Sequence, residues 1–145
     1  MAQRNAMRTL AAVALIQVVA AQGGDDCSAP TVISGTGVFS VDLSSASTSL
    51  GAPCDSLEQD VFFEWTPDEG GDYRFKMTNP LVYVAFHPTI QVAVGGDCNS
   101  TCLAGPFGRY IALSNIVANQ PYLLRISKTD PAGPFTTGWL EIVKD

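Results

Sequence analysis

The chain has 145 residues and carries 14 acidic against eight basic residues, which gives a net charge of −6. This balance disfavours nucleic acid and anionic lipid as partners, because affinity for both comes mainly from clustered Lys and Arg. Neutral glycans, cations and basic proteins fit the charge better. No basic stripe, internal repeat or low-complexity segment interrupts the chain.

The first 21 residues have the features of a secretory signal peptide. Arg4 and Arg8 precede an apolar run that ends in Val19, Ala20 and Ala21, small residues suited to cleavage before Gln22. The run is too short for a membrane anchor, which needs about 20 apolar residues. We therefore expect a secreted or cell-surface protein with no membrane span after cleavage, in which residues 22–145 form a single domain of net charge −8.

Four cysteines remain in the exported chain, and an oxidising compartment predicts that they form disulfides. Three pairings are possible. Proximity in the sequence favours Cys27 with Cys54 and Cys98 with Cys102. A zinc site is the weaker alternative, because the spacings do not form paired CxxC knuckles.

Alternation of apolar and polar residues predicts short strands, and no segment of the mature chain keeps a helical period. The expected strands are residues 38–43, 60–66, 73–77, 82–86, 89–94, 110–118, 122–127 and 139–143, and residues 98–108 and 128–137 are expected to be loops. About eight strands with turn signals between them predict an all-β fold, an antiparallel β-sandwich with a jelly-roll arrangement.

Residues 60–77 carry the clearest of these patterns. Two alternating runs flank Pro67, Gly70 and Gly71, whose backbone preferences suit a chain reversal. We expect the two runs to pair as a half-buried hairpin. A second tight turn is expected around Asn119, since Asn tolerates positive φ.

The same alternation predicts the core, since apolar side chains of one phase must face the second sheet. The predicted core residues are Phe39, Phe63, Trp65, Tyr73, Phe75, Val84, Ile90, Val92, Leu124, Ile126, Leu140 and Ile142. Aromatic residues on the opposite phase or in loops are candidates for display and hence for ligand binding: Phe62, Tyr83, Phe107 and Trp139.

Four sequence pieces, in order, resemble the bacterial pre-peptidase C-terminal domain. They are Asp25-Asp26-Cys27, residues 60–67 (DVFFEWTP) with Gly71-Asp72-Tyr73, residues 89–94 (TIQVAV) before Cys98, and residues 119–126 (NQPYLLRI). The resemblance implies a jelly-roll-like sandwich with a non-catalytic role in binding, stability or surface display. Relatives of this family include collagen-binding modules, some of which bind calcium.

Two departures from that family limit what the resemblance implies. His87-Pro88 stand where the family has an Asp before the strand, and residues 103–107 (LAGPF) replace an Asn/Asp-rich stretch. We therefore carry over the fold and no binding site. Enzymatic activity is not expected either, because the single histidine, His87, lies in a turn and no GxSxG elbow surrounds a serine.

We expect no cofactor, with calcium as the alternative, because hard cations take oxygen ligands from carboxylates and loop carbonyls. Asp25, Asp26 and Asp97 are candidate ligands, with solubility as the simpler explanation of acidic loops. Asn99-Ser100-Thr101 is a glycosylation sequon, which has meaning only in a eukaryotic host.

Two functions remain open after these exclusions. The first is a secreted, non-catalytic module that binds an extracellular glycan or protein surface through exposed aromatic side chains. The second is a structural or assembly protein of a cell envelope or surface layer, which the lone domain without a catalytic cluster suggests. The loops after Cys98 and before Trp139 are the expected places for a ligand.

Overall fold

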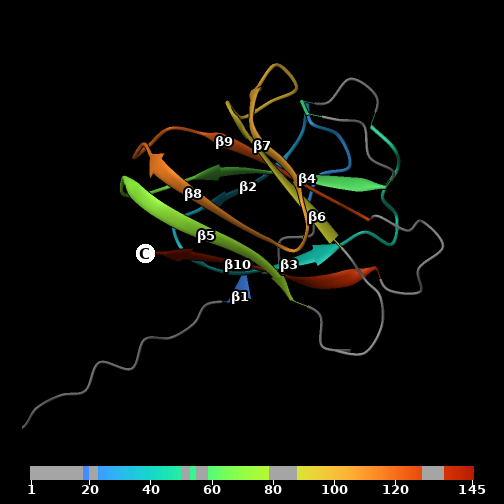
Figure 1. The fold of residues 1–145 in the computed structure, drawn as a ribbon. Coiled ribbons are helices and arrows are strands. Elements are labelled where there is room, and N and C mark those ends of the chain that lie inside the picture. The colour runs from blue at the N-terminus through green and yellow to red at the C-terminus, as the bar shows by residue number, and fades with distance from the viewer. Residues whose placement is uncertain (1–17, 20–22, 50–52, 55–58, 79–87, 129–135) are drawn as a thin grey trace, which may run out of the picture.

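The computed structural model describes residues 18–19, 23–49, 53–54, 59–78, 88–128 and 136–145. The regular structure of these residues is entirely β and forms two five-stranded sheets, which confirms the predicted β-sandwich (Figure 1). Among them, no helix has the length and apolar character needed to span a membrane. The strands are β1 (Val18–Val19), β2 (Thr31–Ser34), β3 (Gly37–Asp42), β4 (Asp60–Thr66), β5 (Gly71–Thr78), β6 (Pro88–Val94), β7 (Thr101–Phe107), β8 (Tyr110–Ile116), β9 (Tyr122–Lys128) and β10 (Thr137–Lys144).

The strand order is that of a jelly roll. Sheet A has the order β1-β3-β10-β5-β8, and sheet B has the order β2-β4-β9-β6-β7. Strands β3 to β10 supply four strands to each sheet, and the chain changes sheet at every connection among them except that between β6 and β7. Two interlocked Greek keys of this kind are the jelly-roll solution to closing a double sheet. The two short strands β1 and β2 extend the sheets by parallel pairing with β3 and β4.

The predicted hairpin at residues 60–77 is wrong, because its two strands lie in different sheets. β4 pairs with β2 and β9, whereas β5 pairs with β10 and β8. The turn after Pro67 therefore carries the chain across the sandwich. Trp65 meets Tyr73 and Phe75 edge-on, with ring centroids 5.0 and 5.1 Å apart, as facing side chains of opposite sheets. Period-2 alternation is the same in both arrangements, so the pattern could not separate them.

Besides the two-residue β1, two strands were missed by the sequence prediction. β7 was expected to be loop, and its pairing with β6 shifts register twice, so its side chains do not keep a simple alternation. β2 is only four residues long and pairs in parallel, which leaves too little pattern to detect. The strand expected at residues 82–86 lies outside the described residues.

The core prediction is confirmed wherever the structure describes it. All the predicted core residues are buried between the sheets except Val84, which lies outside the described residues. Trp65 is central to this core: it is fully buried, and its indole Nε1 donates a 2.7 Å hydrogen bond to the carbonyl oxygen of Gly35. The predicted turn at Asn119 is also confirmed, with φ of 60°.

Replacing Trp65 with Phe is expected to lower the free energy of unfolding by roughly 2 kcal/mol or more, because it removes a buried hydrogen bond and part of a packed ring. Urea-induced unfolding of the purified protein measures this loss. Tyr110→Phe is the control, since Tyr110 is 52% exposed and its change should cost less than about 0.5 kcal/mol. Equal stability of the two variants would contradict the central role of Trp65.

Candidate functional site

The outer face of the central strands of sheet B, β4, β9 and β6, is covered by the chain itself. Gly24 and Phe62 exchange backbone hydrogen bonds of 2.9 and 2.7 Å, which bring residues 23–30 alongside β4. Cys27 then packs with Phe62, Ala93 and Leu123 in a second, smaller apolar cluster. Phe62 has 0% exposure, so our expectation that this ring is displayed is wrong. Its period-2 phase does point away from the main core, but the N-terminal segment covers that face.

Two disulfides fasten this cover, and their pairing differs from the prediction. Cys27 bonds to Cys98 and Cys54 bonds to Cys102, across sequence separations of 71 and 48 residues. The first joins the N-terminal segment to the turn after β6, and the second joins the β3–β4 connection to β7. Sequence proximity failed as a guide because the jelly roll brings distant segments together over sheet B. Two disulfides are compatible with an extracellular protein.

A buried ion pair lies under the same cover. Asp60 on β4 is 0% exposed and accepts hydrogen bonds from Nε of Arg125, at 2.6 Å, and from its Nη2. Nη1 of Arg125 also donates to Gln91, at 3.4 Å, and the guanidinium carbon lies 5.7 Å from the ring centroid of Phe62. The backbone N–H of Ser49 donates to the other Asp60 oxygen, at 3.3 Å. This cluster has no opening to solvent among the described residues, so we assign it a structural role.

The carboxylates proposed for calcium serve local structure. Asp25 accepts hydrogen bonds from the backbone and hydroxyl of Ser47, at 2.6 and 2.9 Å, and so ties the N-terminal segment to the β3–β4 connection. Asp26 and Asp97 each accept a 2.8 Å bond from a backbone N–H two residues ahead. The bond from Ser28 holds the pKa of the Asp26 carboxyl below its ordinary value.

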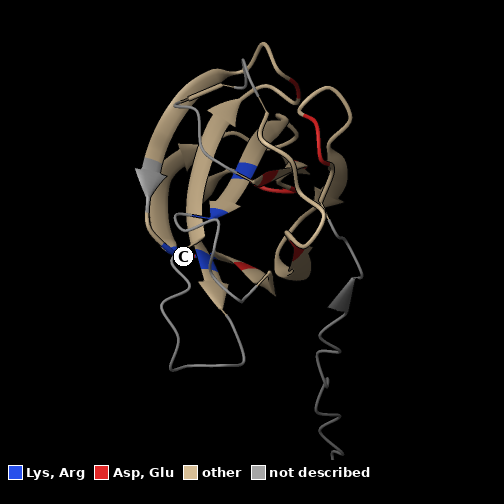
Figure 2. Ribbon diagram, turned by 90° about the vertical axis from the view of Figure 1, so that its right-hand side faces the viewer, with Lys and Arg blue, Asp and Glu red and all other residues tan. Residues whose placement is uncertain are grey.

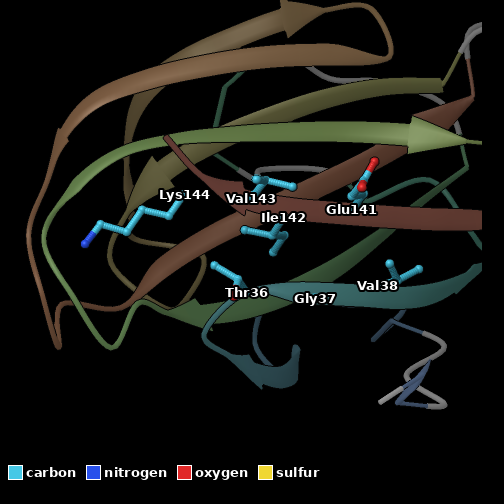
Figure 3. A pocket seen from close by; sticks show the side chains of 7 residues that line it. All are labelled: Thr36, Gly37, Val38, Glu141, Ile142, Val143 and Lys144. Atoms are coloured by element: carbon cyan, nitrogen blue, oxygen red, sulfur yellow. The ribbon is translucent and has the colours of Figure 1, made fainter. Parts of the chain in front are cut away.

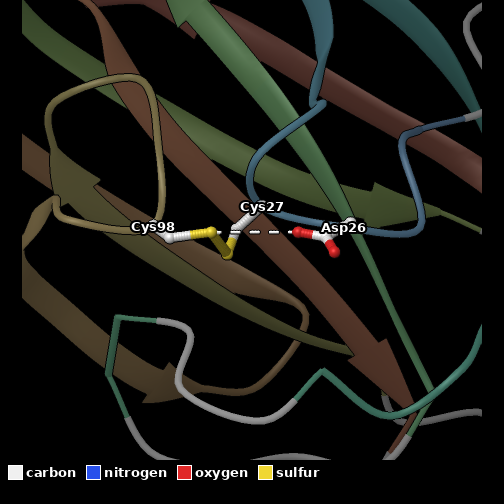
Figure 4. Close-up of side chains that lie close together, drawn as sticks. All are labelled: Asp26, Cys27 and Cys98. Carbon is white, nitrogen blue, oxygen red and sulfur yellow. Dashed lines mark hydrogen bonds between the residues drawn. A yellow bond between two sulfur atoms is a disulfide. The ribbon is translucent and has the colours of Figure 1, made fainter.

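Asp26 also approaches the first disulfide (Figure 4). Its Oδ1 lies 3.8 Å from Sγ of Cys98, but that sulfur is bonded to Cys27 and has no proton to donate and no free thiolate to offer a metal. Within the described residues this is the one group of three potential metal-ligating side chains that the structure brings together. Asp25, Asp26 and Asp97 do not form such a group, and calcium binding stays a prediction.

Most described acidic residues of the protein lie in loops or at strand ends, whereas most basic ones lie on strands (Figure 2).

The outer face of sheet A differs from that of sheet B, since solvent reaches it. In the register of sheet A, Glu141 on β10 is opposite Lys76 on β5, and Lys76 is opposite Tyr110 on β8. Trp139 precedes Glu141 by two residues, and therefore stands on the same face one row along. We call Trp139, Glu141, Lys76 and Tyr110 the sheet A patch.

Trp139 was predicted as a display residue from its phase, and the structure places it half-buried on this outer face. Tyr110 was missed, although the inward phase of Ile111 already implied that its neighbour points outward. The sheet A patch therefore combines one predicted and one unpredicted aromatic ring. Tyr83 and the side chain of Phe107 lie outside the described residues.

A cleft of about 340 Å³ adjoins the patch where β3 and β10 separate (Figure 3). Thr36, Gly37, Val38, Glu141, Ile142, Val143 and Lys144 line it. Glu141 thus belongs to both the cleft and the patch. Val143, which is 36% exposed, adds an apolar wall.

A smaller hollow of about 170 Å³ continues past Lys144 to the turn between β4 and β5. There Lys144 donates a hydrogen bond to Glu69, which lowers the pKa of the Glu69 carboxyl and raises the pKa of Lys144. The lowered carboxyl pKa contributes stability above the unfolded-state pKa, and this contribution is lost as the pH falls through the folded-state pKa. Glu69 is 71% exposed, so solvent screening keeps the effect small.

The predicted sequon asparagine, Asn99, is exposed in the turn between β6 and β7. Its backbone N–H donates to Asp97, and the disulfide at Cys98 holds the turn against the N-terminal segment. A glycan at this position would therefore stand clear of the sheet A patch, since the turn belongs to sheet B.

Comparison of the chain with models of known protein families and with curated proteins finds no match. The candidate site therefore depends on geometry alone.

The disulfide pairing predicts the products of digestion without reduction. Peptides containing Cys27 and Cys98 should be linked, as should those containing Cys54 and Cys102, and mass spectrometry identifies both. Each bond closes a long loop and should stabilise the fold by roughly 4 kcal/mol. A Cys98→Ser variant should release one free thiol and keep the second bond. A linked Cys27–Cys54 peptide from the native protein would contradict this pairing.

Asp60→Asn is expected to lower the free energy of unfolding by about 3–5 kcal/mol, because it leaves the buried Arg125 without its counter-charge. The matched control is Asp145→Asn in the exposed pair with Arg74, whose side chains are 42% and 46% exposed. That change should cost less than about 1 kcal/mol. Denaturant unfolding at neutral pH compares them, and equal losses would contradict a structural role for the buried pair.

Proposed function

We propose that this protein is a secreted, non-catalytic sandwich module that binds an extracellular glycan through the sheet A patch. The observation that carries the proposal is the presence of Trp139 and Tyr110 on one solvent-facing sheet surface, with Glu141 and Lys76 between them. The two disulfides and the apolar N-terminal run support export.

The chemistry of the patch suits a sugar chain. Aromatic rings offer a flat apolar surface with low conformational entropy, on which the C–H face of a pyranose ring can stack. Glu141 accepts and Lys76 donates hydrogen bonds, so together they can satisfy the hydroxyls of the same sugar. The net charge of the exported chain, −8, favours a neutral glycan over a polyanionic one.

The spacing of the rings supports an extended ligand. Tyr110 and Trp139 stand two strands and two residues apart in the register. Strand spacing and rise per residue then separate their backbone positions by about 12 Å. One sugar ring cannot bridge that distance, whereas a short oligosaccharide lying diagonally across β5 can touch both aromatic rings. The cleft at Glu141 would receive the next part of such a chain.

The resemblance to the pre-peptidase C-terminal domain agrees with this proposal, because those domains are non-catalytic sandwiches that serve binding and display. Among the described residues, the buried Asp60–Arg125 cluster is closed to solvent, and the candidate calcium carboxylates already accept hydrogen bonds within the protein. The sheet A patch is therefore the stronger candidate for contact with a ligand.

Glycan arrays followed by isothermal titration calorimetry test the proposal. For the best ligand, Trp139→Ala and Tyr110→Ala should each weaken binding by about tenfold or more, as expected for aromatic anchors. Leu103→Ala is the matched control, because Leu103 is 50% exposed on β7 of the other sheet. Absence of binding to any neutral glycan, or full binding by Trp139→Ala, would overturn it.

The second candidate is a structural or assembly role in a cell envelope. One specific observation favours it, the unprotected edge of β3 described next. Pelleting of the exported protein with cell-surface material tests this role, and free release into the medium would count against it.

A further inference from the structure

The outer strands of the described sheets are β1, β8, β2 and β7, and the last three are protected against pairing with another chain. β7 has two register shifts and contains Pro106, and β8 has a bulge at Asn115, where φ is 61°. β2 is only four residues long. Bulges, proline and shortness are the usual means by which proteins block edge-to-edge association.

β3 has none of these protections. It is six residues long, and its pairing with β10 runs from Asp42 to Gly37 without a register shift. It contains no proline and no basic residue. Its alternation places Phe39 and Val41 in the core, so its register is firmly fixed.

The backbone groups that face outward from β3 can be identified. The N–H of Leu43 donates to Thr136 beside β10, at 2.6 Å, so positions of the same phase point toward β10. Positions of the other phase, including Val38 and Asp42, therefore direct their backbone groups toward the sheet edge. At that edge the structure places β1, whose Val18 and Val19 pair in parallel with Val38 and Phe39.

β1 lies within the predicted signal peptide, residues 1–21. Its removal on export would leave β3 as the outermost strand of sheet A among the described residues. In the precursor this edge accepts an extended apolar segment, and without β1 no other described strand pairs with this edge in the exported chain.

We infer that the exported protein uses this edge to bind a second copy of itself, with the two β3 strands pairing antiparallel about a two-fold axis. Two-fold pairing is self-consistent here because the edge-facing positions of one copy meet edge-facing positions of the other. The register that pairs the full strands places Val38 opposite Asp42 of the partner copy, so no like charges face each other. Sheet A would then continue across the dimer.

This inference is tested apart from glycan binding, because its contacts are backbone groups of β3, whereas the aromatic rings of the sheet A patch lie on β10 and β8; only the cleft beside Glu141 shares Gly37 and Val38 with β3. The two can therefore fail separately. Glycan affinity measures one, and the molar mass of the protein without ligand measures the other.

The first experiment determines the molar mass of the secreted protein by light scattering and sedimentation over about a hundredfold range of concentration. Mass spectrometry first establishes that the chain begins near Gln22. A dimer that dissociates on dilution, with amide protons of Val38 and Asp42 exchanging more slowly in the dimer, is the expected result. A monomer at every concentration, or an exported chain that retains Val18 and Val19, would overturn the inference.

Charge variants test the register. Val38→Asp places two carboxylates opposite each other at both ends of the symmetric pairing and should weaken dimerisation by about tenfold. Adding Asp42→Lys should restore it, because the new pair has opposite charges. Val143→Asp is the matched control: it adds the same charge to the outer face of the neighbouring β10 and should leave the dimer intact. Equal weakening by Val38→Asp and Val143→Asp, or no recovery in the double variant, would overturn the register.

Discussion

The burial of the central strands of sheet B, β4, β9 and β6, on both faces is the constraint on which the rest of the structure depends. Their inner face packs against sheet A, and their outer face is covered by the N-terminal segment and the β3–β4 connection. Arg125 lies on β9, which is buried along its whole length, so its guanidinium needs a counter-charge within the protein. Arg125 finds Asp60, and the two disulfides hold the covering segments in place.

In this arrangement sheet B contributes to stability, and sheet A carries the side chains that are exposed to solvent. Aromatic and charged residues on the central strands of sheet B are buried, as Phe62 and Asp60 illustrate. These side chains therefore cannot contact a ligand. Sheet A faces solvent on its outer side and carries the sheet A patch and its cleft. A glycan bound there would contact strands fixed by the core, so the rings would need little reorganisation on binding.

The sequence predicted the phase of the strands better than their partners. The core residues from Phe39 to Ile142 follow from alternation alone, because any sandwich must bury one phase of each strand. The hairpin and both disulfides were wrongly paired, because a jelly roll joins segments that are distant in sequence and parts segments that are adjacent. For the candidate site, phase identified Trp139 as outward and would have identified Tyr110, but it could not reveal that Phe62 is covered.

The sequence by itself therefore determined an all-β sandwich with an inward phase, a predicted export signal and cysteines suited to an oxidising compartment. Only the tertiary structure decided which strands share a sheet, which cysteines meet and which outward face is open. The physical reason is that alternation is a local property of one strand, whereas exposure depends on every segment packed against it. The burial of Trp65 follows from alternation within its own strand. Phe62 is outward in phase, and it is buried because residues 23–30 cover it.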